Sequence, residues 1–440
     1  MHYAAESTQD LPASSPDSPQ RLVECHDCGL FQMVPPLARY QRAACPRCAS
    51  TVGRPLDTSG DSLTRATVCA LAALIMFLAA LKLPVLDLHS LGRLYRATLF
   101  TGPTNLETLG TSLVAGLVVL TIIVLPAVEL VLLLTVMLGV RLLHPPSWLA
   151  DLFAVALRLR AYAMTEVFLL GVIVAITRLQ VIATITLGPA LLALGAMMLC
   201  LIATLAELDP ETIWSRLRRP QPVPSPLATA PVTAAPLTAT RRKNLIGCDC
   251  CRLVLTAQEN TACPRCGARL AHRKSHSLTR STAFLLAGVI MYLPANLYPV
   301  MTVIRFGQGA PSTIMGGVIE LLQMQMWPLA LLVFTASIAV PVAKITGLFT
   351  MLIATSRKSS RALIFRTRLY RIIDGVGRWS MIDVFMLTVL VALVRMGFIA
   401  SVIPGTGAGA FAAVVITTML ASECFDPRLM WDATEAKTHK

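Results

Sequence analysis

The sequence has little charge. Charged residues occupy only 14% of its 440 positions and aromatic residues only 6%, whereas 55% are hydrophobic and the mean hydropathy is +0.67. Soluble globular chains carry about 25% charged residues, so most of this chain cannot face water. The shortage of charge excludes a soluble globular protein and predicts a membrane protein.

Acidic residues are the scarcer of the charged types, and the formal net charge is +14. An excess of cations can indicate nucleic-acid binding, but here Arg and Lys cluster in segments that connect hydrophobic stretches. Cytoplasmic loops of membrane proteins carry such an excess. We therefore interpret the charge as a signal of membrane orientation and expect no nucleic-acid partner.

Two further patterns are missing. No cleavable signal peptide opens the chain, and its first twenty residues form a polar, proline-containing tail that we expect to stay in the cytoplasm. No P-loop pattern for ATP is present either. The sequence therefore predicts neither an ATPase nor another kind of enzyme.

Long apolar runs are abundant. Residues 71–81, 113–140 and 329–353 are nearly uncharged, and a membrane-spanning helix needs about 20 apolar residues. We expect four such helices in each half of the chain, near 65–86, 111–141, 161–178, 184–206, 279–300, 326–354, 379–396 and 403–424.

An internal repeat divides the chain into these halves. Residues 163–168 resemble 380–385, and at the same spacing Glu166 matches Asp383 and Trp214 matches Trp431. Chance similarity between apolar helices would not reproduce charged residues and Trp in one register. The loop 355–378 carries seven basic residues against the single acid Asp374, so we expect it, and with it both chain ends, in the cytoplasm.

Cysteines form a motif that occurs once in each half. Two C-x-x-C pairs close together supply four thiolates for a tetrahedral ion, and paired thiols in a reducing compartment bind metal more often than they form disulfides. We predict two Zn²⁺ ions, with an iron site of the rubredoxin type as the nearest alternative. Cys250 is an extra thiol. The predicted ligands are Cys25, Cys28, Cys45 and Cys48 in the first module and Cys248, Cys251, Cys263 and Cys266 in the second.

The predicted fold class is an α-helical multi-pass membrane protein with two tandem four-helix transmembrane bundles, each preceded by a small cytoplasmic zinc-ribbon module. The expected divisions are a disordered tail (1–20), the first ribbon (21–55), the first bundle (61–214), a linker (215–243), the second ribbon (244–272), the second bundle (277–432) and a polar tail (433–440).

Several polar residues fall inside the predicted helices. A charged side chain in a bilayer costs roughly 2.5–3.5 kcal/mol on insertion scales, so it usually marks function. We predict one intramembrane cluster in the second bundle that relays a proton or gates lipid entry; an ion pair that holds two helices together is the alternative. Its members are Lys344, Asp383, Ser337, Ser380 and Thr418. Glu129 and Glu166 hold the equivalent positions in the first half, where two acids cannot form the same pair, so the first bundle is expected to be supportive.

These features together resemble the paraquat-inducible protein A family. The residues that carry the resemblance are the two ribbons and the segments 293–296, 298–301, 378–385, 404–408 and 422–432. The match covers nearly the whole chain after the first twenty residues, although 82–85 depart from the fuller motif. The resemblance implies a multi-pass protein of the inner membrane of Gram-negative bacteria. Its implied partner is an MCE-domain protein that forms a tunnel across the periplasm, and its implied cargo is phospholipid.

Two other functions fit parts of the pattern. Internal repeats are also found in secondary transporters, so a small-molecule transporter coupled to protons through Lys344 and Asp383 is one alternative. A membrane-tethered zinc or redox sensor is another, and mutation of Cys263 and Cys266 would abolish signalling in such a protein.

Overall fold

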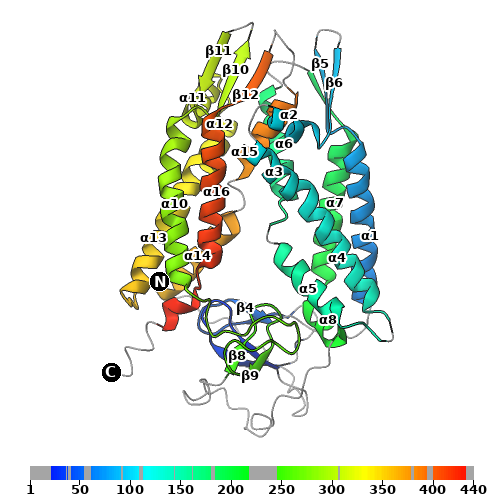
Figure 1. Cartoon of the computed structure of the whole chain (residues 1–440), viewed down its shortest axis with the longest axis vertical. Helices are drawn as coiled ribbons and strands as arrows, with labels where there is room; N and C mark the ends of the chain where they lie inside the picture. The colour runs from blue at the N-terminus through cyan, green and yellow to red at the C-terminus, as the bar shows by residue number, and fades with distance from the viewer. Residues whose placement is uncertain are drawn as a thin grey trace, which may run out of the picture.

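The computed structural model describes residues 21–35, 37, 41–53, 61–90, 93–108, 112–142, 144–160, 162–179, 184–217, 245–305, 308–377, 381–393 and 400–432. Long helices run along the long axis of the molecule (Figure 1). We call the end that carries the cysteine modules, residues 21–53 and 245–270, the ribbon end. The opposite end, which carries the short strands between 86 and 97 and between 301 and 312, is the hairpin end.

The first half begins with a ribbon module and continues into helices. Its elements are β1 (Arg21–Glu24), β2 (Phe31–Val34), β3 (Ala43–Ala44), β4 (Thr51–Gly53), α1 (Asp61–Lys82), β5 (Leu86–Ser90), β6 (Arg93–Ala97), α2 (Thr101–Thr108), α3 (Ser112–Val119), η1 (Leu120–Val124), α4 (Leu125–Gly139), α5 (Trp148–Leu159), α6 (Thr165–Leu179), β7 (Thr184–Leu187), α7 (Pro189–Glu207) and α8 (Pro210–Leu217).

The second half repeats this order. Its elements are β8 (Leu245–Gly247), β9 (Val254–Thr256), α10 (Ser277–Leu297), β10 (Met301–Arg305), β11 (Gln308–Ser312), α11 (Ile314–Gln323), α12 (Trp327–Phe334), η2 (Thr335–Ala339), α13 (Val340–Ser356), α14 (Leu363–Val376), α15 (Ile382–Leu393), β12 (Ala400–Pro404) and α16 (Thr406–Cys424).

Six helical segments in the described part of the chain are long and apolar enough to cross a membrane: 61–82, 112–139, 189–207, 277–297, 327–356 and 406–424. They coincide with six of the eight predicted spans. The third predicted helix of each half is shorter, because α6 and α15 have 15 and 12 residues. The predicted starts at 184 and 403 were too early, since β7 and β12 precede α7 and α16.

A π-helical turn interrupts the second span of each half, at η1 and η2. Each turn ends just before a proline, Pro126 or Pro341, in the first turn of the following helix. Proline has no amide hydrogen to continue the helical ladder, and a wider π turn accommodates that break. The repeat therefore keeps the same irregularity in the same place.

The hairpin end carries two antiparallel three-stranded sheets with strand orders β6-β5-β7 and β11-β10-β12. A glycine lies at the corner where each third strand enters a helix. The Gly188 amide donates to the Val85 carbonyl at 3.0 Å and the Gly405 amide to the Val300 carbonyl at 2.8 Å. A Cβ at either glycine would lie within 2.2 Å of a proline carbonyl oxygen, so a larger residue cannot take this corner.

The two halves pack against each other through α6 and α15. Phe168 and Phe385, which are equivalent positions in the repeat, meet edge to face with ring centroids 5.9 Å apart. A Cβ at Gly171 would lie 3.0 Å from the Phe385 Cβ, and one at Gly102 would lie 2.6 Å from the Thr388 Cγ2. Small residues therefore let the helices approach closely, and one buried apolar core runs through both halves.

Candidate functional site

Each four-cysteine module is built from two knuckles. In all four C-x-x-C turns the residue after the second cysteine has a positive φ: Gly29, Ala49, Arg252 and Gly267. Its amide donates to the carbonyl of the first cysteine at 2.8–2.9 Å. This turn points both thiols of a pair to the same side, so the ligand geometry is local to each knuckle.

The four sulfur atoms of each module lie within 4.8 Å of one another and all eight cysteines are buried. The closest separations between the two knuckles of a module are 3.5–3.6 Å. A tetrahedral zinc ion with Zn–S bonds of about 2.3 Å holds its sulfurs about 3.8 Å apart. The two ligand sets that the sequence predicted are thus brought together, and each fits a metal ion.

Each ribbon docks on the bundle of the other half. Arg47 of the first ribbon lies over the Trp431 ring of the second half, with its Cζ 4.5 Å from the centroid. Arg265 of the second ribbon lies 5.8 Å from the Trp214 centroid of the first half. Both arginines come from a C-P-R-C knuckle, and both tryptophans occupy the same repeat position. The apolar clusters show the same crossed docking. The cysteines of the first module pack with α13 and α14 of the second half, and those of the second module pack with α5 and α8 of the first half.

Ion pairs and hydrogen bonds also join each ribbon to the opposite half. Arg265 Nη2 lies 2.6 Å from Glu211 Oε1 in the first half. Asp27 of the first ribbon accepts from Arg371 Nε of α14 at 2.5 Å, and Arg371 Nη2 also donates to the Cys48 carbonyl at 2.9 Å. The residue after the repeated Asp-Pro is Glu211 in one half and Arg428 in the other. The two docking surfaces therefore carry opposite charges at one position.

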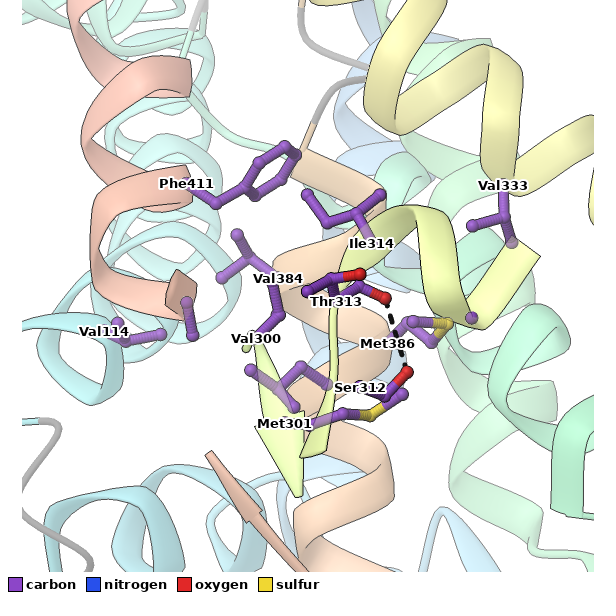
Figure 2. Close-up of a pocket in the computed structure, with 13 residues that line it drawn as sticks. Val114, Val300, Met301, Ser312, Thr313, Ile314, Val333, Val384, Met386 and Phe411 are labelled. Atoms are coloured by element: carbon purple, nitrogen blue, oxygen red, sulfur yellow. Dashed lines mark hydrogen bonds between the residues drawn. The ribbon is translucent and has the colours of Figure 1, made fainter. Parts of the chain in front are cut away.

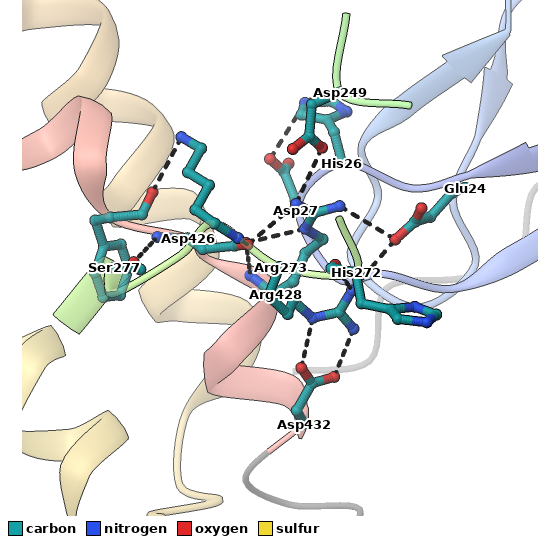
Figure 3. Close-up of polar contacts among 12 residues, drawn as sticks. Glu24, His26, Asp27, Asp249, His272, Arg273, Ser277, Asp426, Arg428 and Asp432 are labelled. Atoms are coloured by element: carbon teal, nitrogen blue, oxygen red, sulfur yellow. Dashed lines mark hydrogen bonds and ion pairs between the residues drawn. The ribbon is translucent and has the colours of Figure 1, made fainter. Parts of the chain in front are cut away.

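Arg428 is the buried centre of a network that joins the two ribbons to the end of the second bundle (Figure 3). It donates to both carboxylate oxygens of Asp426 at 3.0 Å and to Glu24 at 3.3 Å, and it pairs with Asp249 at 3.0 Å. Arg273 adds a bidentate pair with Asp432 at 2.6 and 2.8 Å. Because Glu24 and Asp249 belong to different ribbons, one arginine holds both modules.

The network shifts the acidity of two of its carboxyls. Burial raises the pKa of Glu24 to about 7 and outweighs the charges of Arg428 and Arg273, which lower it. Burial would raise the pKa of Asp426 as well, but hydrogen bonds and charge from Arg428 outweigh it and lower that pKa below its ordinary value. Asp426 is thus held as a carboxylate.

A small, largely apolar pocket lies at the hairpin end. Figure 2 shows Ile314, Val384 and Phe411 converging on it from α11, α15 and α16. Val114 of the first half also lines it, so the pocket lies at the seam between the halves. The Thr313 hydroxyl oxygen accepts from the Gly316 amide as the cap of α11. Apart from Thr313 and Ser312, the residues that line the pocket are apolar, so its surface suits hydrocarbon.

The predicted intramembrane cluster is described in part. Lys344 and Ser337 are buried at 2% and 0% exposure, and within the described residues Lys344 Nζ and Ser337 Oγ have no hydrogen-bond partner. The Thr418 hydroxyl is buried and donates to the Val415 carbonyl at 3.1 Å. Ser380 and the Asp383 side chain lie outside the described residues, so their part in the cluster stays a prediction.

Lys344 points toward the end of α14. A Cβ at Gly377 would lie 2.8 Å from its Nζ, so the missing side chain leaves room for the ammonium group. In the first half, Glu129 takes the position of Lys344 and is 1% exposed, while Glu166 is exposed. Arg160 replaces Gly377 there, and its charge acts on Glu129. The two halves thus place opposite charges at the same depth.

The docking residues were missed in the sequence, although a signal for them exists. Arg47 and Arg265 repeat within the cysteine motif, and Trp214 and Trp431 repeat at the end of each half. Repetition outside the apolar helices marks positions that both halves need. It does not say that the arginine of one half meets the tryptophan of the other.

Comparison with known proteins follows the same division into halves. The family model described as paraquat-inducible protein A matches residues 63–218 and 278–435. The chain is 33% identical over 417 residues to "Intermembrane transport protein PqiA" of Escherichia coli (strain K12), covering 94% of this chain and 97% of that protein.

Two further relatives are similar over most of their length. "Lipophilic envelope-spanning tunnel protein A" of the same strain is 30% identical over 416 residues, covering 94% of this chain and 91% of that protein. "Probable intermembrane transport protein" of Haemophilus influenzae is 28% identical over 431 residues, covering 94% and 96%. These names describe transport proteins rather than enzymes. No solved structure matches the chain.

Proposed function

The chain belongs to the paraquat-inducible protein A family, and from this premise we propose that it is the inner-membrane subunit of an intermembrane lipid transport system. Its relatives are named for intermembrane transport and for a lipophilic, envelope-spanning tunnel. The observation that carries the proposal is the pocket at the hairpin end, whose lining is almost entirely apolar and therefore suits a hydrocarbon group. Phospholipid is the proposed cargo.

The proposed orientation places the ribbon end in the cytoplasm. Arg357, Lys358 and Arg361 are exposed in the loop between α13 and α14 at that end, and cytoplasmic loops are enriched in such cations. The pocket then opens toward the periplasm. The two sheets are small, so a separate periplasmic protein has to bridge the envelope, and we propose an MCE-domain tunnel protein as that partner.

We propose that Lys344 is the functional centre of the second bundle. A lysine with no hydrogen-bond partner among the described residues, buried beside a π-helical turn, is costly to keep, and π turns are frequent at functional sites. We assign the cluster of Lys344, Ser337, Thr418, Asp383 and Ser380 to proton relay or to the gating of lipid entry. Asp383→Asn should then abolish transfer at normal protein levels, and full transfer would support a purely structural ion pair.

The metal that fits both modules best is zinc. Four buried thiolates in a module of about thirty residues replace the core that so short a segment cannot build. Zinc has no redox chemistry, and its role here is to hold each ribbon in the shape that docks. Iron is the competing metal for a four-thiolate site, and metal analysis of the purified chain separates the two.

A transfer assay tests the proposed function. Liposomes that hold the chain and a fluorescent phospholipid are mixed with the soluble periplasmic part of the MCE-domain partner, and lipid is measured on the partner after the liposomes are sedimented. Ser312→Trp would place an indole ring in the pocket lining and should strongly reduce the recovered lipid. The matched control is Met315→Trp on the 44% exposed face of α11, which should transfer normally. Equal recovery from protein-free liposomes would overturn the proposal.

A further inference from the structure

A second apolar surface lies between two helices of the second bundle, in its ribbon-end half. It is an open groove of about 550 Å³ between α10 and α13. Leu285, Leu286 and Val289 line it from α10, and Ile345, Phe349 and Ile353 line it from α13. This groove is separate from the hairpin-end pocket, with which it shares no lining residue.

The few hydroxyls on the groove walls offer no hydrogen to a ligand. Thr282 donates to the Leu278 carbonyl at 2.7 Å, Thr346 to the Val342 carbonyl at 2.8 Å, and Ser356 to the Leu352 carbonyl at 2.9 Å. Because each proton is used inside its own helix, the walls present a hydrocarbon surface. An occupant must therefore be apolar along most of its length.

The groove has the depth of one leaflet. Ile345 and Arg357 are its first and last lining residues on α13, and they lie roughly 18 Å apart along the helix at 1.5 Å per residue. Half of a hydrocarbon core of about 30 Å is about 15 Å. An acyl chain that enters from the ribbon end would fill the groove and stop near the bilayer middle.

The mouth of the groove is cationic. Arg357 lines it, and Lys358 and Arg361 follow on the exposed loop. The sequence holds no Asp or Glu in 277–319 or in 345–373, which contain both walls and the loop. We propose that this groove binds one anionic phospholipid of the ribbon-side leaflet, with an acyl chain against α10 and α13 and its phosphate at Arg357.

In the first half, the arginine that follows the second span bonds to the first helix. Arg141 follows α4 as Arg357 follows α13, but its Nη2 donates across to the Thr67 hydroxyl of α1 at 2.9 Å and to the Leu63 carbonyl at 3.4 Å. Among the described side chains of α10 and α13, no hydrogen bond joins the two helices. Arg357 makes no such bond to a neighbouring helix among the described side chains, so its guanidinium is available to a ligand at the groove mouth. The proposal rests on the membrane orientation given above and not on transport.

Photo-labelling in nanodiscs tests the site. The full chain is placed in phosphatidylethanolamine discs with a small share of phosphatidylglycerol that carries a diazirine in one acyl chain, and labelled peptides are mapped by mass spectrometry. Labels should concentrate on 282–289 and 345–357. Arg357→Gln should reduce them about fivefold, which corresponds to about 1 kcal/mol for one surface cation, while Arg357→Lys should retain them. Leu286→Trp should remove them.

Two variants on the opposite face of α10 provide matched controls. Arg280 and Met291 are each turned by roughly 200° from the groove residues Thr282 and Val289, at 3.6 residues per turn. Arg280→Gln and Met291→Trp should leave labelling of the groove unchanged. Labels spread evenly around α10, or unchanged by Leu286→Trp, would overturn the proposal.

The same experiment separates this site from the proposed function. A diazirine phosphatidylethanolamine that labels the groove as strongly as phosphatidylglycerol would refute the anionic preference. Loss of transfer to the partner with normal labelling would count against transport and leave the groove standing. Normal transfer with no labelling of the groove would refute the lipid site in the groove and leave the transport proposal standing.

Discussion

The pair between Arg265 and Glu211 should decide whether the second ribbon stays docked. Arg265 is 4% exposed and Glu211 is 19% exposed, with Nη2 and Oε1 2.6 Å apart. We expect Glu211→Gln to release the second ribbon from the first bundle while leaving the first ribbon largely in place. The reason is that Gln keeps the volume of Glu but leaves the buried guanidinium uncompensated.

The structure sets the expected magnitude. Removing one partner of a buried ion pair costs about 3–5 kcal/mol, and the partial exposure of Glu211 places this pair at about 3 kcal/mol. That is roughly a hundredfold change in the docking equilibrium, at tenfold per 1.4 kcal/mol. Glu211 also pairs with Arg21 at 2.8 Å, but Arg21 is 36% exposed, and such surface pairs are worth about 0–1 kcal/mol. Arg21→Gln is therefore the matched control.

Hydrogen exchange by mass spectrometry measures the effect in detergent. Amides of β8 and β9 should exchange about a hundred times faster in Glu211→Gln, and amides of β1 and β2 should change little. Arg265→Glu combined with Glu211→Arg should recover part of the protection, since it restores the pair but loses the contact of Arg265 with Trp214. Two results would refute the reasoning. One is that the effects of the single variants Arg265→Glu and Glu211→Arg on exchange simply add in the double variant; the other is that Arg21→Gln speeds the exchange of β8 and β9 as much as Glu211→Gln does.

Three further outcomes follow from the geometry. Gly102→Ala brings a Cβ to 2.9 Å from the Thr388 carbonyl oxygen and should cost about 1–3 kcal/mol in thermal unfolding, whereas Gly116→Ala meets nothing within 4 Å and should be neutral or slightly stabilising. Cys45→Ser should reduce the metal content from two ions per chain to one in elemental analysis; two ions retained would contradict the four-thiolate assignment. Because its pKa is lowered, Asp426 stabilises the fold above about pH 4 and loses that contribution as the pH falls further. Asp426→Asn should therefore flatten the acid end of a stability–pH curve, and an unchanged acid limb would contradict this account.

The family and the metal ligands could be predicted from the sequence because their signals are local or repeated. A C-x-x-C knuckle closes on itself through one turn, so the ligands Cys25 and Cys28 needed no knowledge of the fold. Six long spans followed from apolar length alone. The third helix of each half was predicted as a full span. It is shorter because α6 begins at Thr165 and α15 at Ile382, after the predicted starts at 161 and 379. The fourth helix of each half also begins later than predicted, because β7 and β12 precede it and each of these strands pairs with one distant in the chain.

The sequence by itself determined that this chain lies in a membrane, that it is doubled, and that each half carries four thiols able to hold an ion. Composition, periodicity and motif spacing are properties of the sequence itself, so they can be recognised without knowledge of the fold. Only the tertiary structure decided that the ribbons dock on opposite halves, that Arg428 joins Glu24 to Asp249, and that Val114 reaches the pocket of the second half. Those contacts join residues far apart in the chain, and their partners are chosen by burial and charge after the helices have packed.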